Sequence, residues 1–291
     1  MNPLKNPGKF LVLVRSDSPD AQGLAEFVAN FLSALGHEVR VEVHGDAKPD
    51  VGNPARHASY VDDCALVISM GGDGTMLRAV ELATISEVPV LGVNLGHLGY
   101  LAHIEPDALE ESLKRFIAGD YQVESRMTLS VSVAQDGASY QELFQAALNE
   151  AVIERSLAGH TIGFEVSISG TPFSSFAADG IIIATATGST GYNMSARGPI
   201  LSPDLEAIVV TPISPHMLFD RSLVLSHGQD VEISMTGSRS GELVVDGIHL
   251  ARLVPGSRLR CRPGKLPAKL VVFDDPNFHL ILKNKFQLKD R

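Results

Sequence analysis

The residues of this sequence best suited to chemistry on phosphate groups form the turn Gly71-Gly72-Asp73-Gly74-Thr75. An apolar run at 64–70 precedes the turn with the length of a buried strand, and apolar residues at helical spacing follow at 75–84. Glycines let backbone N–H groups approach an anion, and a helix N-terminus adds a favourable dipole. A carboxylate would repel phosphate unless a metal ion or a proton transfer involves it. Asp73 is therefore a candidate base or Mg²⁺ partner in phosphoryl transfer, with helix capping as the alternative.

A second group of polar residues follows the apolar run 181–183 and extends from Thr187 to Ser195. Its small hydroxyls and free amides suit a ligand with many polar atoms, and Tyr192 is placed to stack on a base or a ribose. A tight turn between strands is the alternative interpretation, because Gly and Ser collect in turns. The length of the segment argues against that alternative, since a two-residue hairpin does not need so many residues.

The pair Asn149-Glu150 interrupts an apolar stretch, with Ala146-Ala147-Leu148 before it and Ala151-Val152-Ile153 after it. A polar pair in such a place is either exposed at the edge of a sheet or positioned for a ligand. A glutamate can accept two hydrogen bonds from a ribose diol, as acidic residues do in dinucleotide sites. Taken alone, this pair does not decide between the two interpretations.

The elements that must position these residues alternate between strands and helices over the first part of the chain. Apolar runs predict strands at 10–14, 39–43, 64–70 and 88–93, and helical spacing predicts helices at 24–35, 75–84 and 106–118. The alternation predicts an α/β N-terminal domain with a parallel, doubly wound sheet. Ligands of such sheets bind at the carboxyl ends of strands, where Gly71–Thr75 and the loop 94–100 fall. The polar residues 44–60 are predicted to form a loop.

After about residue 121 the pattern changes to short strands separated by Gly, Pro, Asp and Ser. Strands are predicted near 129–133, 142–154, 162–169, 178–185, 206–211, 222–226, 230–236, 242–246, 258–262 and 268–273. Many short strands with frequent turns indicate a mostly β C-terminal domain. We therefore predict an α/β domain at 1–120, a β-rich domain at 121–275 and a tail at 276–291.

The tail carries four basic residues, Lys283, Lys285, Lys289 and Arg291. It either packs back on the first domain or forms a solvated basic end.

Composition limits the classes of protein that the chain can be. The 291 residues carry a formal net charge of −10, which argues against a nucleic-acid binder. Cys64 and Cys261 are the only cysteines, too few for a disulfide framework or a zinc cluster. The N-terminus lacks the apolar core of a signal peptide, and no apolar run reaches the length of a membrane span. We therefore expect a soluble cytoplasmic protein with no membrane partner.

Several common catalytic motifs are absent from the sequence. It contains no G-x-G-x-x-G of an ordinary dinucleotide dehydrogenase and no G-x-x-x-x-G-K-[ST] of a P-loop enzyme. It also contains neither H-E-x-x-H nor G-x-S-x-G.

Together these motifs resemble those of NAD kinases, in the same order along nearly the whole chain. The motifs are Gly71–Thr75, Gly92-Val-Asn-Leu-Gly-His-Leu-Gly-Tyr-Leu101, Asn149-Glu150, Gly188-Ser-Thr-Gly-Tyr192 with Ser195 and Gly198-Pro-Ile200, and Thr211-Pro-Ile-Ser-Pro-His216. The Gly71–Thr75 turn alone is less specific, because lipid kinases and phosphofructokinases resemble it. The Asn-Glu pair and the run from Gly188 to Ile200 make the match specific.

The resemblance implies an enzyme that transfers the γ-phosphate of ATP to the adenosine 2′-hydroxyl of NAD, which gives NADP. It also implies an active site between the two domains, a divalent metal cation such as Mg²⁺, and a homo-oligomer, either tetramer or dimer. By position, Asp73 is the proton acceptor. The implied NAD-binding residues are Asp73, Gly74, Asn149, Glu150, His160, Asp179, Thr190, Gly191, Tyr192, Asn193, Met194 and Ser195.

Three positions depart from the family pattern. Gly191 replaces the usual Ala, which is expected to loosen that turn slightly. Arg197 replaces a usual Gly, so either the backbone there is ordinary or Arg197 has a local role. Ile248 stands where many members carry Gln, and a polar contact to the dinucleotide is expected to be missing.

Two other functions compete with the NAD kinase. A lipid or sugar kinase would share only the Gly71–Thr75 turn and would not need Asn149-Glu150 or residues 188–200. A non-catalytic sensor of NAD or NADP would have no use for a base such as Asp73 in the phosphate turn.

Overall fold

The computed structural model describes residues 4, 8–16, 18–44, 61–95, 99–102, 104–135, 137–217, 220–273 and 277–288. These residues divide into two compact units. The first comprises the described residues within Met1–Ala47, Asn53–Ser125 and Ala268–Arg291, and the second those within Arg126–Pro267. Most of the predicted loop 44–60, the centre of the loop 94–100, and Lys289 and Arg291 lie outside the described residues.

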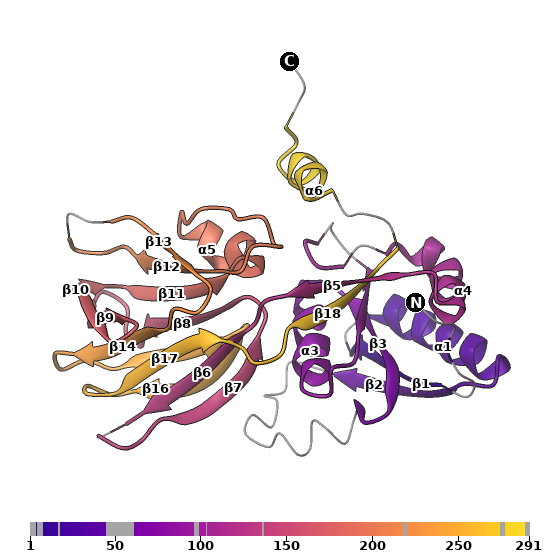
Figure 1. Cartoon of the computed structure of the whole chain (residues 1–291), viewed down its shortest axis with the longest axis horizontal. Helices are drawn as coiled ribbons and strands as arrows, with labels where there is room; N and C mark the ends of the chain where they lie inside the picture. Colours follow the sequence, from indigo (N-terminus) through magenta and orange to yellow (C-terminus); the bar gives the residue numbers. More distant parts are fainter. Residues whose placement is uncertain are drawn as a thin grey trace. The chain divides into compact units, whose positions relative to one another are not determined.

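The first unit is built on a six-stranded sheet with strand order β2-β1-β3-β4-β18-β5 (Figure 1). The strands are β1 (Lys9–Arg15), β2 (Glu38–His44), β3 (Cys64–Gly71), β4 (Val90–Asn94), β5 (Gln122–Arg126) and β18 (Ala268–Val272). The pairs β1–β2, β1–β3, β3–β4 and β4–β18 are all parallel. The strand order reverses direction between β1 and β3, which places the carboxyl end of β3 where ligands of open α/β sheets bind.

Three helices follow the strands of the first unit as the spacing predicts. They are α1 (Pro19–Ala34), α3 (Asp73–Thr84) and α4 (Leu109–Ala118), the last preceded by the short 3₁₀ turn η1 (Pro106–Ala108). A further helix, α6 (Phe278–Lys285), was not predicted. Ser18 caps α1 by accepting a hydrogen bond from the Ala21 N–H, and α4 ends at Gly119 with a φ of 79°. The core joins alternate residues of β1 and β3 to the apolar face of α1 and to Phe116 of α4.

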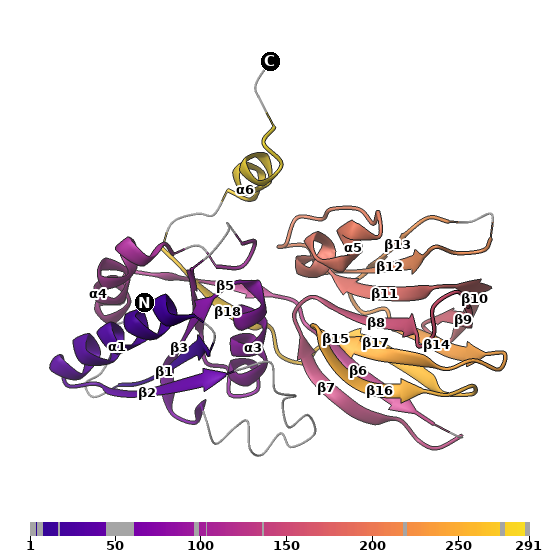
Figure 2. The ribbon, with the colours of Figure 1, turned by 180° about the vertical axis from the view of Figure 1, so that it is seen from behind.

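The second unit consists of two antiparallel six-stranded sheets, ordered β10-β9-β14-β17-β6-β7 and β13-β12-β11-β8-β15-β16 (Figure 2). The strands are β6 (Leu129–Ala134), β7 (Gln141–Ala147), β8 (Glu150–Arg155), β9 (Ile162–Ile168), β10 (Thr171–Ala178), β11 (Gly180–Thr185), β12 (Ala207–Ile213), β13 (Leu223–Ser226), β14 (Val231–Thr236), β15 (Gly241–Val245), β16 (Ile248–Leu253) and β17 (Arg258–Pro263). Both sheets contribute to one apolar core, in which Phe164 of β9 and Ile153 of β8 are fully buried. The C-terminal part is therefore mostly β, as predicted.

The predicted boundary of the second domain is wrong at its end. Residues 268–272 form β18, which pairs with β4 of the first sheet through Leu270 and Val90, so the chain returns to the first unit before residue 275. The strand-like pattern at 268–273 is correct, but no local pattern states which sheet a strand joins. The predicted tail also belongs to the first unit, within which α6 lies.

The second unit differs from the prediction in three places. The stretch 142–154 is divided into β7 and β8, and Asn149 lies in the break between them. Strand β16 was not predicted. Strand β10 was not predicted, because its sequence is polar and contains Pro172. A proline is tolerated there since β10 is an edge strand whose register shifts between Pro172 and Ser174. Within the described part of the chain, no helix is long and apolar enough to cross a membrane.

Candidate active site

The turn between β3 and α3 presents an open helix N-terminus. Gly72 occupies the N-cap position without a side-chain hydrogen bond, and Asp73 is the first residue of α3. A Cβ atom built on Gly72 or Gly74 would meet no heavy atom within 4 Å, and neither residue has a positive φ. Packing within the described residues therefore does not require glycine at these two positions. Their missing side chains leave the first N–H groups of the helix accessible, which suits an anion.

Asp73 does not cap its own helix, so the capping alternative is wrong. Its carboxylate accepts hydrogen bonds from the backbone N–H groups of Tyr100 and Leu101, both at 3.3 Å. Gly99 lies against the same carboxylate, because a Cβ on Gly99 would be 2.3 Å from Asp73 Oδ1. The half-buried carboxylate of Asp73 is thus oriented by the segment that follows β4 rather than by the turn that contains it.

A lysine from α6 lies beside this segment. Lys285 Nζ is 3.6 Å from the centroid of the Tyr100 ring. Desolvation lowers the pKa of Lys285, and the charge of Asp73 partly opposes this effect. Burial and the charge of Asp73 both raise the pKa of Tyr100. A positive charge therefore stands within electrostatic reach of Asp73, and no sequence pattern had connected α6 with the glycine turn.

In the second unit, Glu150 begins β8 and is 8% exposed. Its Oε2 atom is buried with no hydrogen-bond partner within the described structure. Burial raises the pKa of Glu150 to about 8; the neighbouring charge of Asp246 adds to this effect, and a hydrogen bond from the Tyr192 backbone N–H opposes it. A Cβ on Gly191 would lie 2.9 Å from Glu150 Oε2, so the glycine at this position gives the carboxyl group room.

Tyr192 extends along the same face of β8. Its hydroxyl donates a 2.5 Å hydrogen bond to Glu154 Oε1, and Glu154 lies four residues beyond Glu150 on the strand. Residues i and i+4 of a strand share a face, so Tyr192 spans the distance between the two glutamates. Burial and this hydrogen bond raise the pKa of Tyr192 to about 12, although its side chain remains 37% exposed.

The segment from η2 (Thr187–Thr190) to α5 (Tyr192–Ser195) is held together by buried polar groups. Asn193 is fully buried; its amide donates to the carbonyls of Ser189 and Pro199 and accepts from Thr211 Oγ1. Thr190 is also buried, and its hydroxyl donates to the Thr187 carbonyl. Met194 is half-buried and Ser195 is exposed. The side chains of Thr190 and Asn193 therefore support the segment from inside.

His160 and Asp179 lie at the opposite end of β8 from Glu150. Asp179 precedes β11, and its carboxylate is 3.5 Å from Arg155 Nε at the end of β8. Asp179 still acts on this face, because its charge contributes to the raised pKa of Tyr192. His160 is exposed in the turn between β8 and β9. The second unit thus brings Asn149, Glu150, Gly191 and Tyr192 together and places His160 apart from them.

The structure excludes one of the two alternatives for Arg197. Its φ is 66°, in the left-handed region that favours glycine, so the backbone there is not ordinary. Ile248 begins β16 and packs against the apolar core of the second unit, where a glutamine would have brought a polar group.

Two residues that organise the site were missed at the sequence level. Asp246, 9% exposed, accepts hydrogen bonds from the N–H groups of residues 148, 149 and 150. Thr185 is fully buried and donates its hydroxyl hydrogen to the Leu148 carbonyl at 2.6 Å. The only sequence signal was the Asp246-Gly247 dipeptide, which indicates a turn but not what the carboxylate contacts.

No group of three or more His, Cys, Asp or Glu residues within the described ranges is arranged to hold a metal ion.

Comparison with known proteins identifies the family. Residues 55–121 match the model of the ATP-NAD kinase N-terminal domain, and residues 148–273 match that of the ATP-NAD kinase C-terminal domain. The NAD kinase of Corynebacterium glutamicum is 39% identical over 270 residues, covering 89% of this chain and 92% of that protein. The NAD kinase of Mycobacterium leprae is 39% identical over 268 residues, covering 92% of this chain and 82% of that protein.

Solved structures share the fold. Yeast NADH kinase, crystallised with NADH, matches with a TM-score of 0.84 at 23% identity, over 99% of this chain and 90% of that one. An NAD kinase from Archaeoglobus fulgidus, crystallised with ATP, matches with a TM-score of 0.72 at 24% identity, over 97% of this chain and 100% of that one. From the domain models and the bacterial relatives, we conclude that the chain belongs to the NAD kinase family.

Proposed function

We propose that the protein transfers the γ-phosphate of ATP to the 2′-hydroxyl of the adenosine ribose of NAD, with NADP and ADP as products. The observation that supports this most directly is the open N-terminus of α3 with Asp73 as its first residue. Gly72 and Gly74 have no packing reason to be glycine, and their missing side chains leave room for a phosphate group. The bacterial relatives do not favour a lipid or sugar kinase, or a sensor.

In this proposal Asp73 accepts the proton of the 2′-hydroxyl. A carboxylate is too weak a base to remove the proton of an alcohol beforehand. It can orient the hydroxyl and take the proton as the bond to phosphorus forms, because the transition state is loose and gains mainly from positioning and charge stabilisation. The two backbone hydrogen bonds from Tyr100 and Leu101 fix the orientation of the carboxylate for this task.

The remaining predicted residues bind NAD in this proposal. Glu150 accepts hydrogen bonds from a ribose diol, and the exposed ring of Tyr192 provides a flat wall for the dinucleotide. Asn149 contributes polar side-chain atoms, and the segment 190–195 contacts the dinucleotide, with Asn193 acting mainly through its support of the backbone. Gly74 contributes the open backbone at the start of α3. His160 and Asp179 complete the site at the other end of β8.

Mg²⁺, if bound as proposed, would neutralise charge on the ATP phosphates. We also propose a cytoplasmic homo-oligomer of two or four chains, and helices on both faces of the first sheet as in doubly wound proteins. The reversal of strand order between β1 and β3 supports the last point. The other points rest on the family alone.

The test is an assay of NADP formation by the purified protein with NAD, ATP and Mg²⁺, in which each component is omitted in turn. We expect NADP only when all three are present. Replacement of Mg²⁺ by chelator should abolish turnover. Failure to form NADP by a folded protein that binds NAD would instead favour the sensor.

A further inference from the structure

A buried carboxylate in an unusual backbone conformation holds the turn that carries Glu150. Asp246 follows β15 with a φ of 46°, and Gly247 follows it with a φ of 79°. A left-handed conformation is costly for most L-residues, and aspartate tolerates it better than most because its short side chain can bond locally. The Asp246 carboxylate reaches a different strand, nearly a hundred residues away in sequence.

The carboxylate of Asp246 binds three consecutive backbone N–H groups. Its Oδ2 atom accepts from Leu148 at 2.7 Å, and its Oδ1 atom accepts from Asn149 at 2.9 Å and from Glu150 at 3.0 Å. The Asp246 N–H in turn donates to the Glu150 carbonyl at 3.0 Å. Four hydrogen bonds therefore join one residue to the start of β8.

The carbonyl side of the same turn is held by the end of β11 and the residues that follow it. Thr185 donates its hydroxyl hydrogen to the Leu148 carbonyl at 2.6 Å and its backbone N–H to the Asn149 carbonyl at 2.8 Å. Gly188 packs so closely that a Cβ there would lie 2.1 Å from the Asn149 carbonyl oxygen. The N–H groups of residues 148–150 thus face Asp246, and the carbonyls of 148 and 149 face Thr185 and Gly188.

The result of this clamp is a glutamate held in an unfavourable place. Glu150 is buried, its Oε2 atom has no partner among the described residues, and the negative charge of Asp246 adjoins it. Side chains in such surroundings normally turn towards water, because unpaired buried polar groups cost free energy. Here the fixed backbone and the Tyr192 N–H keep the carboxyl group in position.

We propose that Asp246 is a positioning residue for the dinucleotide site, which holds Asn149 and Glu150 in the conformation that binds NAD and places a second negative charge behind Glu150. This inference rests on the proposed function, because it assumes that Glu150 binds NAD. Asp246 itself is buried against the protein backbone and is not proposed to touch the ligand. Its effect is transmitted through the backbone of 148–150 and through the charge that Glu150 experiences.

The charge has a consequence that a structural anchor would lack. Two neighbouring groups change the pKa of Glu150. The charge of Asp246 raises it and so favours the protonated form, whereas the backbone N–H of Tyr192 lowers it. A carboxylate is the better acceptor for a ribose diol, so NAD should bind more tightly as the pH rises towards 8. Removal of the Asp246 charge should allow Glu150 to ionise at lower pH.

The experiment compares Asp246→Asn with the wild type by NAD calorimetry and by steady-state kinetics between pH 5.5 and pH 9. Asparagine keeps one acceptor oxygen but faces at least one N–H group with its own NH₂. We expect the KM for NAD to rise about tenfold or more, with kcat at saturating NAD nearly retained. The pH midpoint of NAD binding should move to lower pH by about one pH unit.

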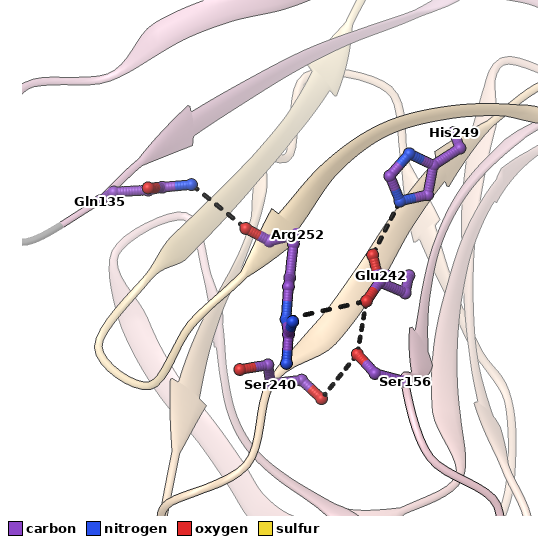
Figure 3. A network of polar contacts seen from close by, with 6 residues as sticks. All are labelled: Gln135, Ser156, Ser240, Glu242, His249 and Arg252. Atoms are coloured by element: carbon purple, nitrogen blue, oxygen red, sulfur yellow. Dashed lines mark hydrogen bonds and ion pairs between the residues drawn. The ribbon is translucent and has the colours of Figure 1, made fainter.

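Glu242→Gln is the matched control on the same strand. Glu242 lies on β15, near the end remote from Asp246, and its carboxylate contacts Ser156, His249 and Arg252 (Figure 3). This variant also removes a hydrogen-bonded carboxylate from β15, but it leaves the clamp on 148–150 unchanged. We expect its NAD affinity and pH midpoint to equal those of the wild type.

Thr185→Val tests the position of the turn without a change of charge. It provides a second test of the proposal if Asp246→Asn folds poorly. We expect a higher KM for NAD with an unmoved pH midpoint. An Asp246→Asn protein, or a Thr185→Val protein, with wild-type NAD affinity overturns the proposal. A loss of affinity without movement of the midpoint in Asp246→Asn overturns the charge effect. Failure of the proposed function is distinguished by the wild type, because a wild-type protein that forms no NADP refutes that function itself.

Discussion

The hydroxyl of Tyr192 donates a 2.5 Å hydrogen bond to Glu154, which lies four residues beyond Glu150 on the same face of β8. Tyr192 is therefore held at both ends, by its ring hydroxyl on Glu154 and by its backbone N–H on Glu150. A ring fixed in this way loses little conformational entropy when a ligand stacks on it. Its 37% exposure leaves part of one surface available for that contact.

We predict that Tyr192→Phe binds NAD nearly as well as the wild type, whereas Tyr192→Ala binds it poorly. Phenylalanine keeps the ring and loses only the bond to Glu154. Stacking on an aromatic ring is worth about 1–3 kcal/mol per base, so alanine should weaken NAD affinity about five- to a hundredfold. Calorimetry on folded proteins provides the measurement. Equal affinity of the two variants would mean that the ring does not contact NAD.

Asp73→Asn is predicted to lower kcat by a factor of roughly 10²–10⁴, which is the usual range for loss of a general base. Asparagine keeps an acceptor for one of the two N–H groups of Tyr100 and Leu101, so the fold should survive and NAD should still bind. NADP formation and NAD affinity are measured on one preparation. Glu81→Gln is the control, because it removes a carboxylate from the same helix at its interaction with Arg78. Near-normal turnover of Asp73→Asn would show that Asp73 is not the proton acceptor and only holds the backbone of residues 100 and 101.

Glu150→Ala is predicted to raise the KM for NAD about ten- to a hundredfold, because a hydrogen bond to a charged group is worth roughly 1.5–3 kcal/mol. The loss should affect the ground state and the transition state together, so kcat at saturating NAD changes little. Steady-state kinetics with NAD varied at fixed ATP gives both constants. An unchanged KM would remove Glu150 from the binding site.

Glu150 should also make the stability of the ligand-free protein depend on pH. Its pKa is about 8 in the folded state, against about 4.3 for an unfolded glutamate. The folded state therefore binds more protons between these values, and the contribution of Glu150 to stability, present below about pH 4, is lost as the pH rises through about 8. Each pKa unit corresponds to about 1.4 kcal/mol, so the total is of the order of a few kcal/mol.

Glu150→Gln, which resembles the protonated side chain, should remove this dependence. Thermal unfolding between pH 5 and pH 9 without NAD is the measurement. We expect the variant to be more stable than the wild type at pH 9 and close to it at pH 5. Parallel pH profiles of the two proteins would show that Glu150 ionises normally.

Arg197→Gly is predicted to stabilise the protein by about 0.5–1 kcal/mol. A left-handed conformation costs an L-residue roughly 1–2 kcal/mol, and glycine recovers this at the expense of greater freedom in the unfolded chain. Arg197→Ala keeps the unfavourable φ of 66° but loses the guanidinium, and it should show no gain. Denaturant unfolding of the three proteins separates backbone from side chain. Lower activity of Arg197→Ala would assign the guanidinium a local role.

Much of this protein was predictable because local patterns report local hydrogen bonding and burial. The run 64–70, the glycine turn and the spacing at 75–84 predicted β3, the turn and α3, since each depends on residues within a few positions. Most of the short strands of the second unit were predictable for the same reason. Order of motifs along the chain identified the family.

Contacts between distant segments depended on the tertiary structure. The pairing of β18 with β4 joins residues about 180 positions apart, and the contact of Asp246 with 148–150 joins residues nearly 100 apart. Lys285 reaches Tyr100 in the same way. Such contacts arise from the packing of whole elements, for which periodicity carries no information. The sequence alone therefore determined which residue types the site contains, whereas only the packed chain decided which backbone and which charges hold Glu150 and Asp73 in place.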